Sequence, residues 1–121
     1  MEHPTYGNGK ICYLEIPAKD VKTSAAFYEK IFGWKIRTRG DGSNAFDDVV
    51  EEVSGTFVTG REPHNDKSLT VYLMVFDMRA TLKLITENGG KIVEDMDDQA
   101  REKTAKFSDP AGNIFGLYQE S

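Results

Sequence analysis

The sequence is poor in the residues that most often bind metals or form disulfides. Its 121 residues include one cysteine, Cys12, and two histidines, His3 and His64. A single cysteine cannot form a disulfide within the chain, which fits a reducing compartment. Cys12 lies in an apolar stretch, so we expect a buried, inert thiol rather than a nucleophile. We expect each histidine to be solvated or structural rather than a metal ligand.

The sequence also lacks long hydrophobic runs and basic clusters. Its longest apolar run is the six-residue segment 71–76, far short of the ~20 residues that a transmembrane helix requires. No secretory signal is visible, so we expect a cytoplasmic protein without membrane contacts. The 20 acidic and 15 basic side chains give a net charge of −5, which argues against nucleic-acid binding. An apolar content of 39% predicts one globular domain over residues 1–121.

The two halves of the chain share a spacing of helix-start, helix-stop and turn residues. Sliding the sequence by 57 residues aligns Asp20 with Asp77, Gly33 with Gly90, and Gly55 with Gly112. We interpret this spacing as a duplication. Module one then covers about residues 9–61, a linker covers 62–66, and module two covers about 67–119.

Each module is predicted to have the order βαβββ. Asp20 and Asp77 are expected N-caps, and glycines end both helices. The predicted helices follow these caps, and the predicted strands are 10–16, 34–39, 45–53, 56–61, 69–76, 91–94, 103–108 and 113–119. The predicted fold class is α+β, with tandem βαβββ modules forming a curved eight-strand cup and two helices on the outside.

Strand alternation predicts which side chains face away from the helices. If Leu14 and Ile16 pack under the first helix, Tyr13 and Glu15 face the other way. Two curved sheets meeting through such faces would enclose an aromatic groove typical of small-molecule sites. The predicted ligand-binding residues are Tyr13, Glu15, Phe57, Thr59, Thr70, Tyr72, Met74 and Tyr118. An ordinary packed interior gives a similar pattern, but Glu15 would then need a partner, for which Arg61 is a candidate.

Three segments together resemble a known family. They are EIPAKD with AFYEKIFGW (residues 15–20 and 26–34), ENGG (87–90) and DPAGNI (109–114). These segments resemble the vicinal oxygen chelate superfamily, which holds glyoxalases, bleomycin-resistance proteins and extradiol dioxygenases. The resemblance covers about residues 9–119 and implies paired modules that build a cup, and a homodimer.

The resemblance also implies four metal-ligand positions, which here carry Tyr13, Thr59, Thr70 and Gly116. Metal-binding relatives have His, Gln and Glu at these positions. Glycine offers no side-chain donor, and neutral threonine is a weak one. We therefore expect no metal and no cofactor, and neither metal-assisted glyoxalase nor dioxygenase chemistry.

Three functional hypotheses follow. The leading one is a metal-independent protein that holds an aromatic or amphipathic small molecule in the aromatic-lined cup. The first alternative is a lyase or isomerase in which Glu15 is the general base, with a pKa raised by burial. The second alternative is a dimeric accessory domain without a ligand. The sequence leaves open whether the protein is an enzyme.

Overall fold

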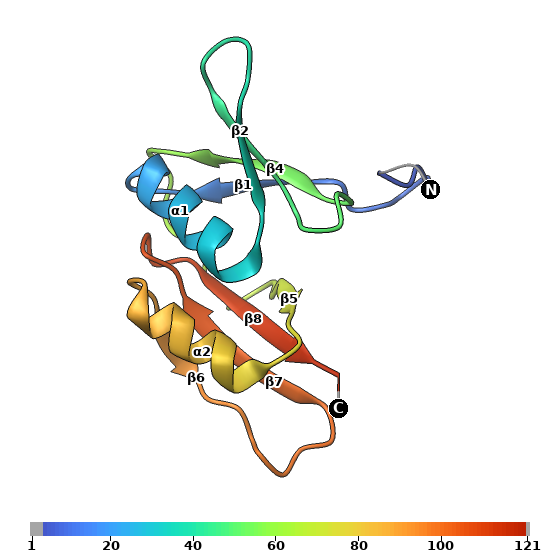
Figure 1. Cartoon of the computed structure of the whole chain (residues 1–121), viewed down its shortest axis with the longest axis vertical. Helices are drawn as coiled ribbons and strands as arrows, with labels where there is room; N and C mark the ends of the chain where they lie inside the picture. The colour runs from blue at the N-terminus through green and yellow to red at the C-terminus, as the bar shows by residue number, and fades with distance from the viewer. Residues whose placement is uncertain (1–3, 121) are drawn as a thin grey trace. The chain divides into compact units, whose positions relative to one another are not determined.

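The computed structural model describes residues 4–120 and contains two helices and eight strands (Figure 1). The chain divides into two compact units, one ending at Arg61 and the other beginning at Glu62. Each unit contains one helix and one four-stranded sheet in the order βαβββ. The predicted α+β class and the tandem modules are therefore confirmed.

The first unit has a mixed sheet with the strand order β1-β4-β3-β2, in which β1 and β4 run parallel. Its elements are β1 (Tyr13–Pro17), α1 (Val21–Phe32), β2 (Lys35–Thr38), β3 (Asn44–Asp47) and β4 (Ser54–Val58). The cap residues are the predicted ones. The Asp20 carboxylate accepts hydrogen bonds from the backbone and the hydroxyl of Thr23, and Gly33 closes α1 in a left-handed conformation with φ 73°.

The core of the first unit is a cluster of aromatic side chains between α1 and its sheet. The Tyr28 ring stacks on Trp34 at 4.5 Å and on Phe57 at 5.8 Å between centroids. Gly55 of β4 leaves room for the Phe46 ring, since a Cβ on Gly55 would lie 2.7 Å from Cε2 of Phe46. This close approach requires glycine at position 55.

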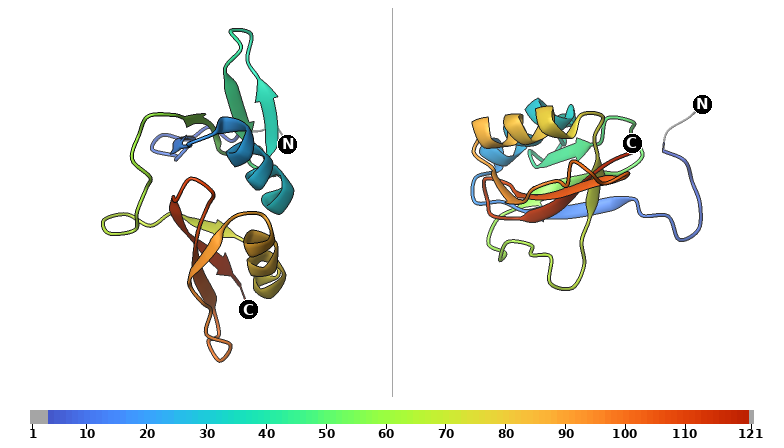
Figure 2. Two further views of the ribbon diagram at one scale, coloured as in Figure 1. Left: turned by 90° about the vertical axis from the view of Figure 1, so that its left-hand side faces the viewer. Right: turned by 90° about the horizontal axis from the view of Figure 1, so that it is seen from below.

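The second unit repeats the arrangement, with the strand order β5-β8-β7-β6 and parallel β5 and β8. Its elements are β5 (Tyr72–Met74), α2 (Met78–Glu87), β6 (Lys91–Glu94), β7 (Lys103–Ser108) and β8 (Ile114–Gln119). Figure 2 shows each helix on one side of its own sheet. The fully buried side chains Ile85, Phe107 and Leu117 contribute to the core of this unit.

A buried polar turn joins the start of the second unit to β8. Both Asp109 Oδ1 contacts are backbone N–H donors, those of Ala111 and Asn113, each at 2.9 Å. The Asn113 side chain donates to Asp109 Oδ2 at 2.8 Å and accepts from the backbone of His64 at 2.8 Å. The His64 ring stacks on Phe115 at 5.5 Å between centroids, so this histidine is structural.

The spacing of 57 residues holds for the first strand and helix of each module but not for the last strand. Glu15 pairs with Thr56, whereas Tyr72, 57 residues after Glu15, pairs with Gly116. The counterpart of Gly116 is therefore Thr56, and the predicted match with Thr59 is wrong. The loop 95–102 is longer than the equivalent loop 39–43, which shifts the register.

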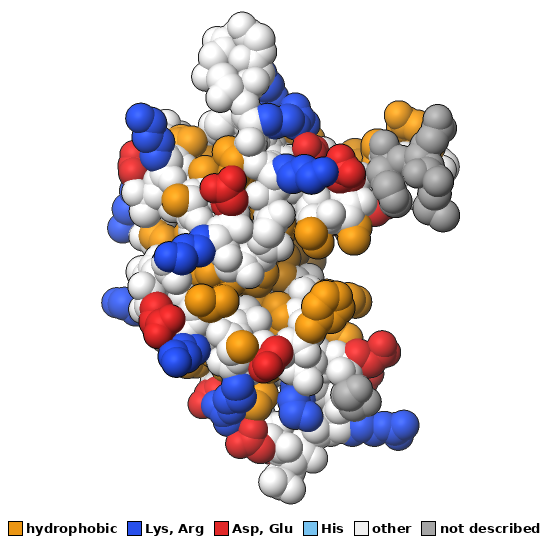
Figure 3. All heavy atoms as spheres, viewed as in Figure 1, with side chains coloured by type: hydrophobic (Ala, Val, Ile, Leu, Met, Phe, Trp, Pro, Cys, Tyr) orange, Lys and Arg blue, Asp and Glu red, His pale blue; other side chains and the backbone are white. Residues whose placement is uncertain are grey.

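Over the described residues, no helix combines the length and the apolar character needed to cross a bilayer. In Figure 3, basic and acidic side chains are interspersed on the visible face of both units, and hydrophobic side chains lie among them.

Candidate ligand-binding faces

The side of each sheet that turns away from its helix is called its open face. On β1, Ile16 is buried under α1, and the exposed Tyr13 and Glu15 lie on the open face of the first sheet. Tyr13 lies opposite Ser54 of β4, and Glu15 lies opposite Thr56. The alternation predicted from the sequence therefore places both side chains on this face.

Glu15 forms an ion pair with the residue that the sequence offers as its partner. Arg61 Nη2 donates to Glu15 Oε1 at 2.7 Å, and both side chains are about half exposed, at 52% and 47%. The general-base hypothesis requires an apolar surrounding for Glu15. An exposed, arginine-paired carboxylate does not have that surrounding.

A second ion pair crosses the open face between β2 and β3. Arg37 donates to both carboxylate oxygens of Asp47, at 2.9 and 3.1 Å, and the Ser54 hydroxyl donates to Asp47 at 2.6 Å. The hydrogen bond from Arg37 holds the pKa of the Asp47 carboxyl below its usual range, and the bond from Ser54 acts in the same direction. The Asp47 charge is therefore satisfied within the face.

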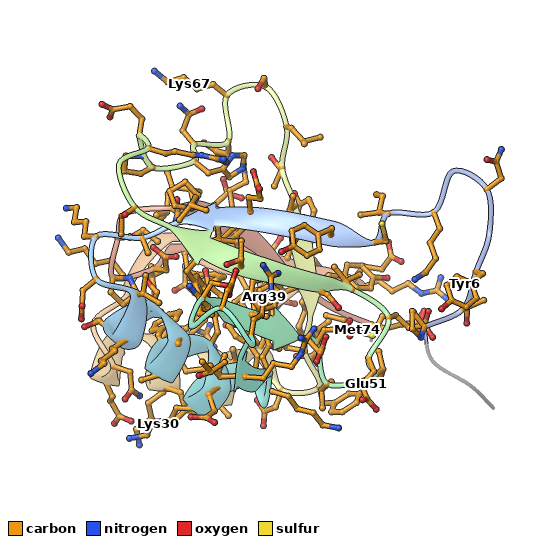
Figure 4. The ribbon with its side chains drawn as sticks, turned by 90° about the horizontal axis from the view of Figure 1, so that it is seen from above. Tyr6, Lys30, Arg39, Glu51, Lys67 and Met74 are labelled. Carbon is orange, nitrogen blue, oxygen red and sulfur yellow. The ribbon has the colours of Figure 1, made fainter. Side chains whose placement is uncertain are left out.

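Arg39 reaches over the open face from the segment that follows β2. Its guanidinium donates to the Tyr13 hydroxyl, and its Cζ lies 5.9 Å from the centroid of the Tyr13 ring. Figure 4 labels Arg39 beside the strands of the first unit. Because this contact joins residues 26 positions apart in the sequence, local patterns do not reveal it.

The open face of the second sheet carries an aromatic ring that lies against glycine. Tyr72 and Met74 of β5 are exposed, whereas the intervening Leu73 is half-buried. A Cβ on Gly116 would lie 2.5 Å from Cε1 of the Tyr72 ring and closer still to Cδ1. The absence of a side chain at Gly116 therefore lets the Tyr72 ring lie directly on β8.

Two polar pairs flank the Tyr72 ring on the open face of the second sheet. Lys106, which pairs with Gly116 in the sheet, donates to Asp66 at 2.8 Å, and this bond raises the pKa of Lys106. The Tyr118 hydroxyl donates to Glu102 at 2.8 Å, which raises the pKa of Tyr118. This face thus combines aromatic surface with a small number of polar groups, a typical composition for a ligand site.

Three sequence expectations about side-chain positions are wrong. Phe57 does not face a groove: it is buried under α1, where it packs against Tyr28 and Phe46. Thr59 follows β4 as an exposed residue, and Cys12 precedes β1 with an exposed thiol. Thr70 precedes β5 and is half-buried. The shifted register of β4 accounts for the first two differences.

Arg39 and Lys106 are the two open-face residues that the sequence analysis missed. The signal for Lys106 is its parity: it lies between the buried Ala105 and Phe107 on a strand. Arg39 has no such signal, because it lies outside any strand and reaches its partner through a long side chain.

The residues at the metal positions implied by the resemblance do not fit a divalent ion. With the corrected register, they are Tyr13 and Thr56 on the first open face, Thr70, and Gly116 on the second. None offers an imidazole or a carboxylate, and the Tyr72 ring covers Gly116. Among the residues that the structure describes, no three His, Cys, Asp or Glu side chains are grouped to hold a metal.

Two βαβββ modules, each with one helix-covered and one open sheet face, define a protein of the glyoxalase-like class. The family model of the glyoxalase/bleomycin resistance protein/dioxygenase superfamily matches residues 10–117. The chain belongs to this superfamily.

Two curated relatives and one solved structure illustrate the similarity. A glyoxylase-like domain-containing protein from Didymella fabae is 32% identical over 101 residues, which are 74% of this chain and 75% of that protein. The anthracycline biosynthesis protein DnrV from Streptomyces peucetius is 25% identical over 133 residues, 95% of this chain and 48% of that protein. The chain therefore spans about half the length of this second relative.

The solved structure shares the fold at low sequence identity. It is a member of the glyoxalase/bleomycin resistance protein/dioxygenase superfamily from Sphaerobacter thermophilus, with a TM-score of 0.73 and 18% identity. The match covers 93% of this chain and 98% of that one.

Proposed function

We propose that the protein binds a planar aromatic or amphipathic small molecule on its open sheet faces without a metal ion. One observation carries the proposal: a half-exposed tyrosine ring takes the place of a metal-ligand side chain on each face. Tyr13 itself occupies such a position, and the Tyr72 ring lies over Gly116. The flat, exposed rings offer stacking surface where metal-binding relatives carry charged donors.

The energetics of stacking support useful affinity. Each aromatic pair contributes ~0.5–1.5 kcal/mol beyond burial, and the exposed Met74 adds an adaptable apolar contact. The similarity to a protein named for anthracycline biosynthesis suggests planar polycyclic compounds as the first ligands to test.

We expect Tyr72→Ala to weaken the binding of a planar polycyclic ligand by about 3- to 10-fold, the loss of one stacking contact. The affinity is measured by isothermal titration calorimetry with a panel that includes an anthracycline. Tyr6→Ala is the matched control, because Tyr6 is 91% exposed and precedes the first sheet. An equal loss in both variants, or no binding by the wild type, would contradict the proposal.

The enzyme alternative is tested at Glu15. Because Glu15 is exposed and paired with Arg61, we expect no turnover of the bound compounds, and Glu15→Gln should bind them within about threefold of the wild type. Chromatographic analysis of ligands and thiol adducts after prolonged incubation provides the measurement. Turnover by the wild type that disappears in Glu15→Gln, with binding intact, would establish the lyase or isomerase alternative.

We also propose a cytoplasmic homodimer, by analogy with the superfamily. Sedimentation equilibrium at several protein concentrations tests the oligomeric state. A dimer that binds no compound in the panel would favour the accessory-domain alternative.

A further inference from the structure

Arg39 differs from the other cationic side chains on or beside the open face of the first sheet. Four of these side chains pair with carboxylates at 2.7 to 3.4 Å. The pairs are Arg37–Asp47, Arg61–Glu15, Lys35–Glu51 and Lys10–Glu52. Within residues 4–120, the guanidinium of Arg39 has no carboxylate at ion-pair distance, and it donates instead to the neutral Tyr13 hydroxyl. Its positive charge is therefore available to another group.

The geometry of Arg39 suits the recognition of an anion. A guanidinium carries five N–H donors in one plane, and the single bond to Tyr13 leaves most of them for a second partner. The side chain is half-buried and lies over the Tyr13 ring at 5.9 Å, which limits its freedom. A fixed, partly desolvated guanidinium binds carboxylate or phosphate oxygens in bidentate fashion.

The carboxylates near Arg39 are already engaged by other donors. Asp47 accepts three hydrogen bonds from Arg37 and Ser54, and Glu15 accepts one from Arg61. Asp41, two residues along the same loop, accepts from the backbone and the hydroxyl of Ser43, and its attraction to Arg39 is a minor influence on its pKa. An anionic ligand therefore meets few uncompensated negative charges beside Arg39.

We propose that Arg39, held over Tyr13, binds the anionic oxygen group of the ligand, so that the preferred ligands are aromatic carboxylates or phosphates. This inference rests on the proposed function, to which it adds the charge of the ligand. Tyr13 occupies a metal-ligand position of the superfamily. The guanidinium thus supplies a fixed positive charge where metal-binding relatives have a cation.

The test uses three probes of matched shape: 2-naphthoate, 2-naphthyl phosphate and the neutral 2-naphthamide. We expect the wild-type protein to bind at least one anion about tenfold more tightly than the amide, by NMR shift titration. Arg39→Gln should remove this preference and leave the affinity for the amide unchanged. Arg101→Gln, which removes the same charge from an exposed loop of the second unit, should retain the preference.

Each outcome of this test bears on one claim. The tighter of the two anions identifies carboxylate or phosphate as the recognised group. Equal binding of all three probes, or an undiminished preference in Arg39→Gln, would overturn the inference while the proposed function stands. A preference lost equally in Arg101→Gln would also overturn it, since net charge alone would then explain the effect. No binding of any probe would overturn both.

Discussion

Replacing Asn113 with alanine is expected to lower the free energy of unfolding by about 3 kcal/mol. Asn113 is fully buried, and its side chain serves both Asp109 Oδ2 and the backbone N–H of His64. The substitution removes a donor from a buried carboxylate and leaves a backbone N–H without its acceptor. Both losses fall on the turn that holds the start of the second unit against β8.

Urea denaturation followed by circular dichroism measures this effect. Asn65→Ala is the matched control, because Asn65 is exposed and its side chain accepts only one local hydrogen bond, from the Lys67 backbone. We expect the control to change stability by less than about 0.5 kcal/mol. A loss below about 1 kcal/mol for Asn113→Ala would show that the buried turn is not a major source of stability.

Gly55→Ala is expected to destabilise the protein by about 3 kcal/mol or more. The new methyl group would lie 2.7 Å from Cε2 of the Phe46 ring and closer still to the carbonyl oxygen of Leu14. The Leu14 oxygen belongs to the backbone of β1, the strand that pairs with Gly55, so relief requires the two strands to separate. The buried Phe46 ring cannot move away without disturbing its stacking on Trp34.

Thermal and urea unfolding of the variant test this prediction. Gly40→Ala serves as the control, because a Cβ at Gly40 meets no atom within 4 Å. The control should keep the wild-type stability within about 0.5 kcal/mol. A Gly55→Ala protein as stable as the control would mean that β1 and β4 are not packed as described.

Much of the fold could be predicted because its signals are local. Asp20 caps α1 and Gly33 ends it through hydrogen bonds within a few residues, which a sequence pattern reveals. The open-face positions of Tyr13 and Tyr72 follow from strand alternation and from a spacing that is constant over the first half of each module.

The rest of the candidate faces depends on features that no local pattern encodes. The repeat placed Thr59 and Phe57 on the ligand face because the differing loop lengths, 39–43 against 95–102, were not taken into account. The register of β4 puts Thr56 there instead. Arg39 joins the face through a contact between opposite edge regions of the sheet, which only the three-dimensional structure provides.

The most direct test of the central claim combines metal analysis with ligand titration. The purified protein is assayed for zinc, nickel and iron, and a planar polycyclic ligand is titrated before and after treatment with a chelator. The account predicts the same affinity in both titrations and a weaker one in Tyr72→Ala. A stoichiometric metal whose removal abolishes binding would contradict it.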